Sequence, residues 1–194
     1  MIILITGPSG TGKTTFVRRL MAADPRLAFS VSTTTRPMRK GEVQGVDYDF
    51  VDEAAFDQLL AENAFIEWAH VHGNRYGTRH SCVNQLVQEG RLPLLDIDVQ
   101  GGANVIEQYG PELLSVFLFP PSWDELEPRL SQRGTDSPEV IATRLRNARQ
   151  EVGLAPLYSY WIVNDDLEAA VDRMQAVITA HGCRREAFES PPLD

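Results

Sequence analysis

A glycine-rich segment near the N-terminus carries the residue types and spacing best suited to chemistry. It consists of Gly7, Pro8, Ser9, Gly10, Thr11, Gly12, Lys13, Thr14 and Thr15. Gly7 and Gly12 lack a Cβ atom, so the backbone can turn tightly and bring its N–H groups close to an anion. Lys13 supplies an ammonium group for the phosphates of a nucleotide, and Thr14 supplies a hydroxyl for a magnesium ion. We therefore expect a phosphorylated nucleotide to bind at this loop.

The segments on either side of this loop favour the same interpretation. An apolar run at 2–5 precedes it, and residues 16–20 follow it as a helix whose N-terminus adds a partial positive charge. The alternative is a glycine-rich turn that happens to precede a lysine. Of the 18 basic residues only Lys13 and Lys40 are lysines, which indicates a need for a compact ammonium group at position 13.

Length and composition indicate one ordinary globular unit. The chain has 194 residues, 43% hydrophobic and 23% charged, so it is neither disordered nor membrane-like. The net charge of −9 argues against a nucleic-acid partner, and no apolar run approaches the roughly 20 residues that cross a bilayer. Because Met1 leads directly into the first apolar run, we expect no cleavable signal and a cytoplasmic location. Cys82 and Cys183 are interpreted as ordinary thiols, and His70 and His72 suggest no metal site.

Helical and apolar segments alternate along the chain, which indicates an α/β fold with a mostly parallel sheet flanked by helices. We expect core strands at 2–6, 92–97, 114–119 and 160–163, and helices at 12–23 and 167–180. The single domain would have a core of residues 1–32, 89–121 and 153–181, and a tail at 182–194. A lobe at 33–88 would hold short antiparallel strands and a helix with Asp52 as its N-cap. A second insertion at 122–152 is helical and rich in arginine.

Capping residues predict where the helices of this second insertion begin. Ser122 and Glu125 form a capping box, and Ser137-Pro138 is a favoured start for a second helix. Pro128 falls about six residues into the first of these helices, where it removes a backbone donor. We expect that helix to kink or to restart near Arg129.

Six further segments resemble the sequence motifs of guanylate kinases. They are SVSTTTRPMRKGEVQGVDY (30–48), FIEWA (65–69), GNRYGT (73–78), LLDIDVQG (94–101), RGTDS (133–137) and IVNDDL (162–167). With the phosphate loop they extend over nearly the whole chain. The resemblance implies a phosphate-loop core, an inserted lobe that binds a nucleoside monophosphate, and a helical lid at 122–152. It also implies Mg²⁺-dependent transfer of the γ-phosphoryl group of ATP to GMP, and to dGMP, in purine nucleotide metabolism.

The resemblance assigns roles to individual residues. GMP would be bound by Ser32, Arg36, Arg39, Tyr48, Glu67, Tyr76, Thr78 and Asp98. ATP would be bound by the loop residues 7–15 together with Arg133 and Asn164. Mg²⁺ would be held by Thr14 and by Asp96, directly or through water. Catalysis would depend on Lys13, Arg36, Arg39, Asp96, Arg129 and Arg144.

The residues assigned to the base fit the chemistry of guanine. An ionised Glu67 can accept hydrogen bonds from both N1–H and the N2 amino group. Ser32 and Thr78 can donate to O6, an acceptor that adenine lacks. The alternative for Glu67 is an exposed carboxylate in an ordinary strand.

The residues assigned to the acceptor phosphate also fit their role. Arg36 and Arg39 offer paired N–H groups, and Tyr48 and Tyr76 offer hydroxyls, which together suit a dianionic phosphate. A solvated basic turn beside two packing aromatic rings is the alternative.

The remaining assignments concern the strand end after residue 95 and the lid. Strand alternation would place Asp96 and Asp98 on one face, near the magnesium ion and the acceptor nucleoside respectively. Capping of the next helix is the alternative for both carboxylates. Arg129 and Arg144 would meet charge on the transferred phosphoryl group, and Arg133 would pack on adenine. The alternative for these arginines is a solvated helical face.

Two other functions remain open from the sequence. One is a related kinase that phosphorylates a sugar phosphate such as ribose 1,5-bisphosphate. The other is a guanylate-kinase-like module that binds proteins without catalysis. The complete phosphate loop and Glu67 favour the enzyme that acts on GMP. The sequence leaves the oligomeric state open.

Overall fold

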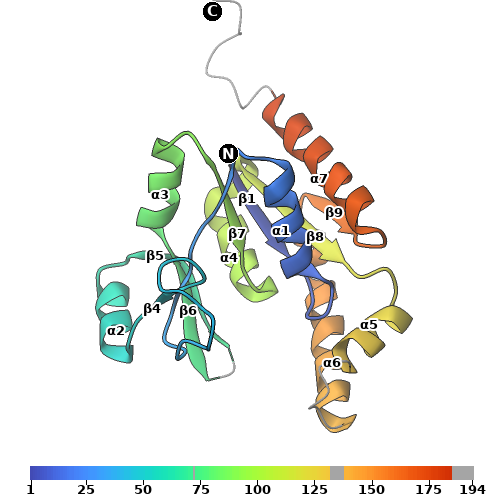
Figure 1. Cartoon of the computed structure of the whole chain (residues 1–194), viewed down its shortest axis with the longest axis horizontal. Coiled ribbons are helices and arrows are strands. Elements are labelled where there is room, and N and C mark those ends of the chain that lie inside the picture. Colours follow the sequence, from blue (N-terminus) through green and yellow to red (C-terminus); the bar gives the residue numbers. More distant parts are fainter. Residues whose placement is uncertain (72, 132–137, 185–194) are drawn as a thin grey trace, which may run out of the picture. The chain divides into compact units, whose positions relative to one another are not determined.

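The structure, a computed structural model, describes residues 1–71, 73–131 and 138–184. Its contacts divide the chain into two compact units (Figure 1). The first unit comprises Met1–Pro25 and Asp96–Asp194, and the second comprises Arg26–Leu95. The second unit therefore contains the whole of the lobe predicted at 33–88 and extends beyond it at both ends.

Three parallel strands form the centre of the first unit. They are β1 (Ile2–Thr6), β8 (Leu113–Phe119) and β9 (Tyr160–Val163). β8 pairs with β1 on one side and with β9 on the other. Every residue of β8 except Phe119 is buried, as expected for a strand that is covered on both faces.

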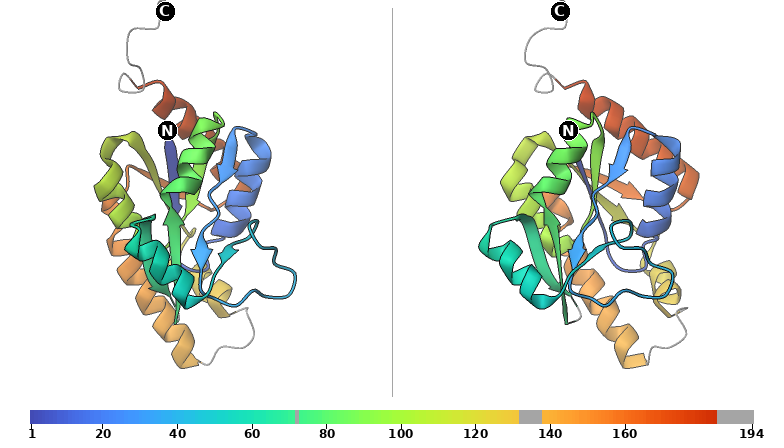
Figure 2. Two further views of the ribbon diagram at one scale, coloured as in Figure 1. Left: turned by 90° about the vertical axis from the view of Figure 1, so that its left-hand side faces the viewer. Right: turned by 60° about the vertical axis from the view of Figure 1, so that its left-hand side comes forward.

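Helices α1 (Lys13–Ala23), α4 (Val99–Tyr109) and α7 (Leu167–Gly182) cover the faces of these strands. Helices α5 (Trp123–Ser131) and α6 (Pro138–Gly153) pack on each other, and short 3₁₀ turns lie at Gly110–Glu112 and Ala155–Leu157. In Figure 2, α4 lies on one side of β1 and β8, and α1 and α7 lie on the other. Arg19 on α1 donates two hydrogen bonds to Glu168 on α7, at 2.7 and 2.6 Å. The predicted α/β fold with a parallel sheet flanked by helices is confirmed.

Helix α5 corrects one prediction. It runs from Trp123 to Ser131 with Pro128 inside it, so a restart near Arg129 is wrong, and the expected kink stays a prediction. The missing N–H of Pro128 affects only the carbonyl of Asp124, four residues earlier. Asp124 and Pro128 are both exposed, so water can bond to this carbonyl. None of the described helices is long and apolar enough to span a membrane.

The second unit contains one parallel strand pair and a separate small sheet. Strand β2 (Leu27–Phe29) pairs in parallel with β7 (Leu92–Asp96), whose last residue belongs to the first unit. The small sheet has the order β4-β3-β6-β5. Its strands are β3 (Thr33–Thr34), β4 (Asp49–Phe50), β5 (Phe65–Val71) and β6 (Asn74–Arg79). β6 is antiparallel to β3 and β5, as predicted for this lobe, and β3 and β4 form a parallel pair that the sequence did not predict.

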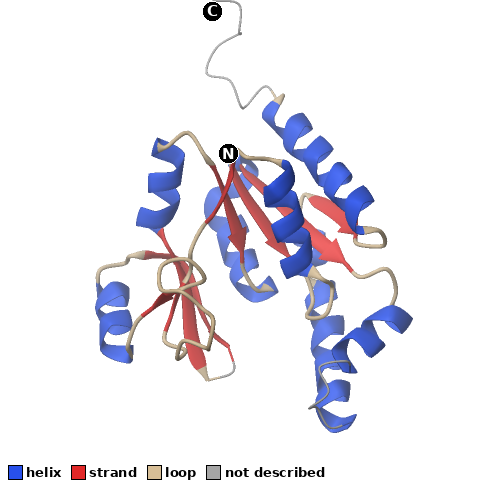
Figure 3. Ribbon diagram, viewed as in Figure 1, coloured by secondary structure: helices blue, strands red, loops and turns tan. Residues whose placement is uncertain are grey.

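Two helices complete the second unit (Figure 3). They are α2 (Glu53–Ala61) and α3 (His80–Gln88). Asp52 is the N-cap of α2 as predicted, and its carboxylate accepts a hydrogen bond of 2.7 Å from the N–H of Ala55. β2 and α3 were not foreseen: β2 has only three residues, and α3 begins without a side-chain cap.

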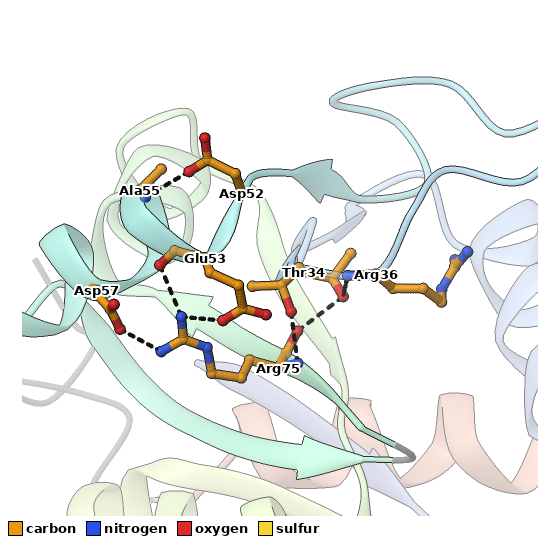
Figure 4. Close-up of polar contacts among 8 residues, drawn as sticks. Thr34, Arg36, Asp52, Glu53, Ala55, Asp57 and Arg75 are labelled. Carbon is orange, nitrogen blue, oxygen red and sulfur yellow. Dashed lines mark hydrogen bonds and ion pairs between the residues drawn. The ribbon is translucent and has the colours of Figure 1, made fainter.

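Arg75 fastens α2 to strand β6 (Figure 4). Its guanidinium group bonds to Asp57 at 2.6 Å, to the carbonyl of Glu53 at 2.8 Å, and to the carboxylate of Glu53. The guanidinium carbon also lies 4.5 Å from the centre of the Phe56 ring. One side chain thus holds three residues of α2.

Candidate active site

The glycine-rich loop turns tightly into the start of α1. Gly10 and Gly12 have φ angles of +87° and +88°, in the left-handed region that glycine adopts without strain. The Thr11 hydroxyl bonds to the carbonyl of Pro8 at 2.5 Å, and the carbonyl of Gly12 accepts the N–H of Phe16 at 3.0 Å. The first N–H groups of α1 lie just after this turn, where the partial positive charge of a helix attracts anions.

Lys13 and Asp96 form an ion pair within the first unit. Lys13 is the first residue of α1, and Asp96 is the last residue of β7, 83 positions later. The side chains of both are 21% exposed. The structure thus brings together the lysine predicted to bind phosphates and the carboxylate predicted to lie near Mg²⁺.

Asp98 caps helix α4. One of its oxygens, Oδ1, accepts the N–H groups of Gln100 and Gly101, each at 2.9 Å. β7 ends at Asp96, so the expectation that Asp96 and Asp98 share a strand face is wrong. Capping, the alternative considered for this pair, holds for Asp98. Its contact with the acceptor nucleoside stays a prediction.

Asn164, just after β9, contacts the phosphate loop directly. Its side chain donates a hydrogen bond of 2.8 Å to the carbonyl of Thr11, and its own N–H bonds to the carbonyl of Phe119 at 2.9 Å. Asn164 is 8% exposed. It therefore braces the loop, whereas its predicted contact with ATP is untested. Arg133, the other residue predicted to contact adenine, lies outside the described residues.

Helix α5 also packs against the phosphate loop. A Cβ atom built on Gly10 would lie 3.0 Å from a methyl carbon of Leu126 and 3.0 Å from one of Leu130. Both leucines belong to a buried apolar cluster with Ala148 of α6, and Leu145 packs against that cluster. The loop, α5 and α6 therefore share one continuous packed surface.

Glu151 on α6 is a site residue that the sequence did not reveal. Its carboxylate accepts a hydrogen bond from the N–H of Ser9 in the phosphate loop. Burial raises the pKa of Glu151, and the charge of Asp98 raises it further, whereas Lys13 and the bond from Ser9 lower it. No motif marks this position, because only the fold brings α6 to the loop.

The two lid arginines described in the structure have different surroundings. Arg129 on α5 forms an ion pair of 3.0 Å with Glu125, one helical turn earlier. Arg144 on α6 is partly buried. Nearby, Arg149 lies over the ring of Trp123, with 5.8 Å between its guanidinium carbon and the ring centre. The predicted contacts of Arg129 and Arg144 with the transferred phosphoryl group remain predictions.

In the second unit, Glu67 is buried beside Thr78. Glu67 is 7% exposed and Thr78 is 1% exposed, so the alternative of an exposed carboxylate is wrong. The two residues lie opposite each other on β5 and β6, and the Thr78 hydroxyl donates to Glu67 at 2.8 Å. The strand register shifts between Phe65 and Glu67, which re-aims the Glu67 side chain. A buried, oriented carboxylate is suited to accept hydrogen bonds from a base.

Two tyrosines predicted to bind the acceptor phosphate lie around the guanidinium group of Arg36. Arg36 is 9% exposed and lies over the Tyr48 ring, with 5.3 Å between its guanidinium carbon and the ring centre. Tyr76 hydrogen-bonds to Arg36, and the rings of Tyr48 and Tyr76 are 5.9 Å apart. Phe50 lies on the same group, at 5.6 Å. The alternative of a solvated basic turn is therefore wrong for Arg36.

Glu42 is a second residue that the sequence did not reveal. Its carboxylate accepts hydrogen bonds of 2.7 Å from the Arg36 guanidinium group and from the N–H of Arg39. The bond to Glu42 raises the pKa of Arg36, and the same bond lowers the pKa of Glu42. The Arg39 side chain is exposed. The backbone carbonyl of Ser32 accepts a hydrogen bond of 2.9 Å from the N–H of Asp49.

Comparisons with known proteins agree with the resemblance found in the sequence. The family model for guanylate kinase matches residues 1–181. The guanylate kinase of Syntrophotalea carbinolica is 46% identical over 98% of this chain and 90% of its own length. That of Nitratidesulfovibrio vulgaris is 52% identical over 91% of this chain and 84% of its own. The crystal structure of guanylate kinase from Anaplasma phagocytophilum matches with a TM-score of 0.77 and 33% identity, over 95% of this chain and 87% of that one.

Proposed function

Because the chain belongs to the guanylate kinase family, we propose that its first unit holds ATP with Mg²⁺ and its second unit holds GMP. Family membership makes the chain a nucleoside monophosphate kinase that phosphorylates GMP with ATP as co-substrate. The observation that carries the assignment of the acceptor site is the buried Glu67, oriented by Thr78.

We propose that Glu67 reads the Watson–Crick edge of guanine. Its carboxylate accepts both N1–H and the N2 amino group, while Thr78 and Ser32 supply hydroxyls near O6. Adenine presents an amino group where guanine has O6, so AMP would leave buried polar groups unpaired, which can cost on the order of 10⁴-fold in rate. These contacts do not involve the ribose 2′-hydroxyl, so dGMP should also be an acceptor.

Arg36, Arg39, Tyr48 and Tyr76 bind the acceptor phosphate in this proposal. The support is that Arg36 already contacts both tyrosines and is held by Glu42. The bonds of the Arg36 guanidinium group to Glu42, to the Pro37 carbonyl and to Tyr76 use three of its five N–H groups. The other two can turn to a phosphate.

On the donor side, the loop residues 7–15 and Lys13 hold the phosphates of ATP, with Asn164 bracing the loop. Thr14 and Asp96 offer hydroxyl and carboxylate oxygens, the ligands that Mg²⁺ prefers. Among the described residues no cluster of three or more His, Cys, Asp or Glu side chains could hold a metal alone. This fits Mg²⁺, which is commonly bound by one or two protein oxygens together with substrate phosphates. When bound, Mg²⁺ neutralises charge on the phosphates.

The mechanism is positioning and charge neutralisation without a covalent intermediate. Lys13 neutralises phosphate charge from the loop, and Arg129 and Arg144 meet the charge on the transferred group from the lid. The attacking oxygen belongs to the GMP phosphate, which is largely ionised at neutral pH, so no strong general base is required. The lid excludes water from the transfer. We expect this enzyme of purine nucleotide metabolism to be cytoplasmic, with neither nucleic acid nor membrane as a partner.

One assay tests acceptor choice directly. ADP release from ATP and Mg²⁺ is measured with GMP, dGMP, AMP and ribose 1,5-bisphosphate offered in turn. We expect turnover with GMP and dGMP and little or none with the other two. Turnover with ribose 1,5-bisphosphate and none with GMP would make the chain a sugar-phosphate kinase. Omitting Mg²⁺ in the presence of a chelator should abolish turnover.

A further inference from the structure

Thr34 makes hydrogen bonds that the proposed phosphate site does not explain (Figure 4). Its hydroxyl donates to the carbonyl of Arg75 at 2.9 Å and accepts the N–H of Arg36 at 3.1 Å. Thr34 is 0% exposed, so water does not compete for either bond. A single buried hydroxyl therefore joins the backbone of Arg36 to the backbone of β6.

The strand register places Thr34 between the aromatic residues of the phosphate site. On one side of β3, Thr34 lies opposite Tyr76 of β6, and on the other side it lies opposite Phe50 of β4. Both rings belong to the group that surrounds the Arg36 guanidinium. Thr34 thus fixes the backbone of Arg36 between the residues that its side chain contacts.

The bond to Arg36 also explains where β3 ends. A strand that continued past Thr34 would use the N–H of Arg36 in the ladder, but the Thr34 hydroxyl accepts it instead. The next residue, Thr35, keeps the chain on β6 through two bonds of 3.0 Å to the backbone of Arg75. The chain leaves the sheet at Arg36, and the loop that carries Arg39 and Glu42 begins there.

We propose that Thr34 is a positioning residue for GMP phosphorylation, which sets the place of Arg36 relative to Tyr76. It touches no substrate and acts through Arg36, so this inference rests on the proposed role of Arg36 in binding the acceptor phosphate. The second anchor of the arrangement is Arg75, whose side chain is fixed on α2 by Glu53 and Asp57.

The neighbouring Thr33 offers a matched control. It lies in the same strand and is also 0% exposed, but among the described residues its hydroxyl has no hydrogen-bond partner. Thr33→Val and Thr34→Val make the same isosteric change at adjacent buried positions. Only Thr34→Val leaves the N–H of Arg36 without its acceptor.

The test compares steady-state kinetics of the full chain and its variants. For Thr34→Val we expect KM for GMP to rise about tenfold, the usual effect of leaving one buried donor unpaired, with KM for ATP unchanged. Thr33→Val should stay within about twofold of wild type for both substrates. Thr34→Ser keeps the hydroxyl and should restore KM for GMP. An unchanged KM for GMP in Thr34→Val, or equal effects at both threonines, would overturn the proposal.

Calorimetry separates positioning from a general loosening of the second unit. Guanosine, which has no phosphate, should bind Thr34→Val as well as it binds wild type, while GMP binds about tenfold more weakly. Equal losses for both ligands would mean that Thr34 has a purely structural role. The premise that Arg36 binds the acceptor phosphate is tested separately with Arg36→Met. If that variant keeps the wild-type affinity for GMP, the proposed function of Arg36 is wrong, and this result is distinct from a failure of the Thr34 proposal.

Discussion

The two units build their phosphate sites in opposite ways. In the first unit the groups proposed to hydrogen-bond to phosphate come from one continuous segment, where the turn at Gly10 and Gly12 leads directly into α1. In the second unit the proposed donors come from two segments far apart in the chain, the loop at 35–48 and strand β6, and Tyr48 and Tyr76 meet at Arg36. A site formed by one segment can be read from the local sequence, whereas a site formed by distant segments depends on how the strands pair. Substitutions should therefore affect the two substrates separately.

Lys13→Met should have the largest effect. Without the ammonium group nothing replaces its charge on the ATP phosphates, so we expect turnover to fall at least about 1,000-fold. GMP affinity, measured by calorimetry, should remain within a few-fold of wild type because Lys13 lies in the first unit and the proposed GMP site lies in the second. Lys40→Met, which changes the only other lysine, at an exposed position, is the control. Equal loss of turnover and GMP affinity in Lys13→Met would contradict separate sites.

Glu67→Gln should have the next largest effect, on the other substrate. The amide presents a donor toward the donors of guanine and also loses charge, so kcat/KM for GMP should fall about 100-fold or more. ATP affinity should not change. Glu62→Gln removes an exposed carboxylate from the same unit and serves as control. Unaltered GMP kinetics in Glu67→Gln would reject Glu67 as the residue that reads the base.

Asn164→Ala should have a smaller effect that sharpens the comparison, because it removes a long-range brace from the local loop. The carbonyl of Thr11 loses its 2.8 Å bond, and we expect KM for ATP to rise about three- to tenfold while KM for GMP is unchanged. Asp165→Asn, at the exposed neighbouring position, is the control. Wild-type KM for ATP in Asn164→Ala would mean that the loop holds its shape without help.

Tyr158→Phe should give the smallest effect at neutral pH and concerns the first unit alone. Burial raises the pKa of Tyr158 to about 12, above its ordinary value of 10. A raised pKa in the folded state means that stability is complete below pH 10 and is lost as the pH rises from 10 to 12. The free energy of unfolding of wild type should fall toward that of Tyr158→Phe across this window, by at most about 3 kcal/mol. Denaturant titrations at pH 9 and pH 11.5 measure the difference, and parallel behaviour of the two proteins would exclude a buried, neutral Tyr158.

The same contrast explains what the sequence could and could not predict. The strands at 2–6 and 160–163 and the cap at Asp52 follow from short-range patterns, and the structure places them as expected. The ion pair of Lys13 with Asp96 joins residues far apart in the chain. The motif supplied each partner, but nothing local in the sequence indicates their contact.

In the second unit the resemblance named the residues assigned to GMP but not their arrangement. The parallel pairing of β3 with β4, the register shift before Glu67 and the two bonds of Thr34 all depend on which residues lie opposite each other. Strand register is set by the whole unit, so a single sequence does not state it. The opposite error concerns Asp98, which we expected to continue the strand. It caps the next helix instead, and that interaction depends on residues only two and three positions later.

The contact of Gly10 with α5 limits how this chain can vary. Gly10 combines a φ of +87° with close approach to Leu126 and Leu130. Shortening either leucine would relieve the crowding but not the backbone strain of a side chain at that φ. Substitutions in α5 can therefore remove the crowding at position 10, but they leave the strain that a side chain would meet at that φ. Gly10 thus limits the size of the α5 side chains that face it, whereas no substitution in α5 widens the choice of residue at position 10.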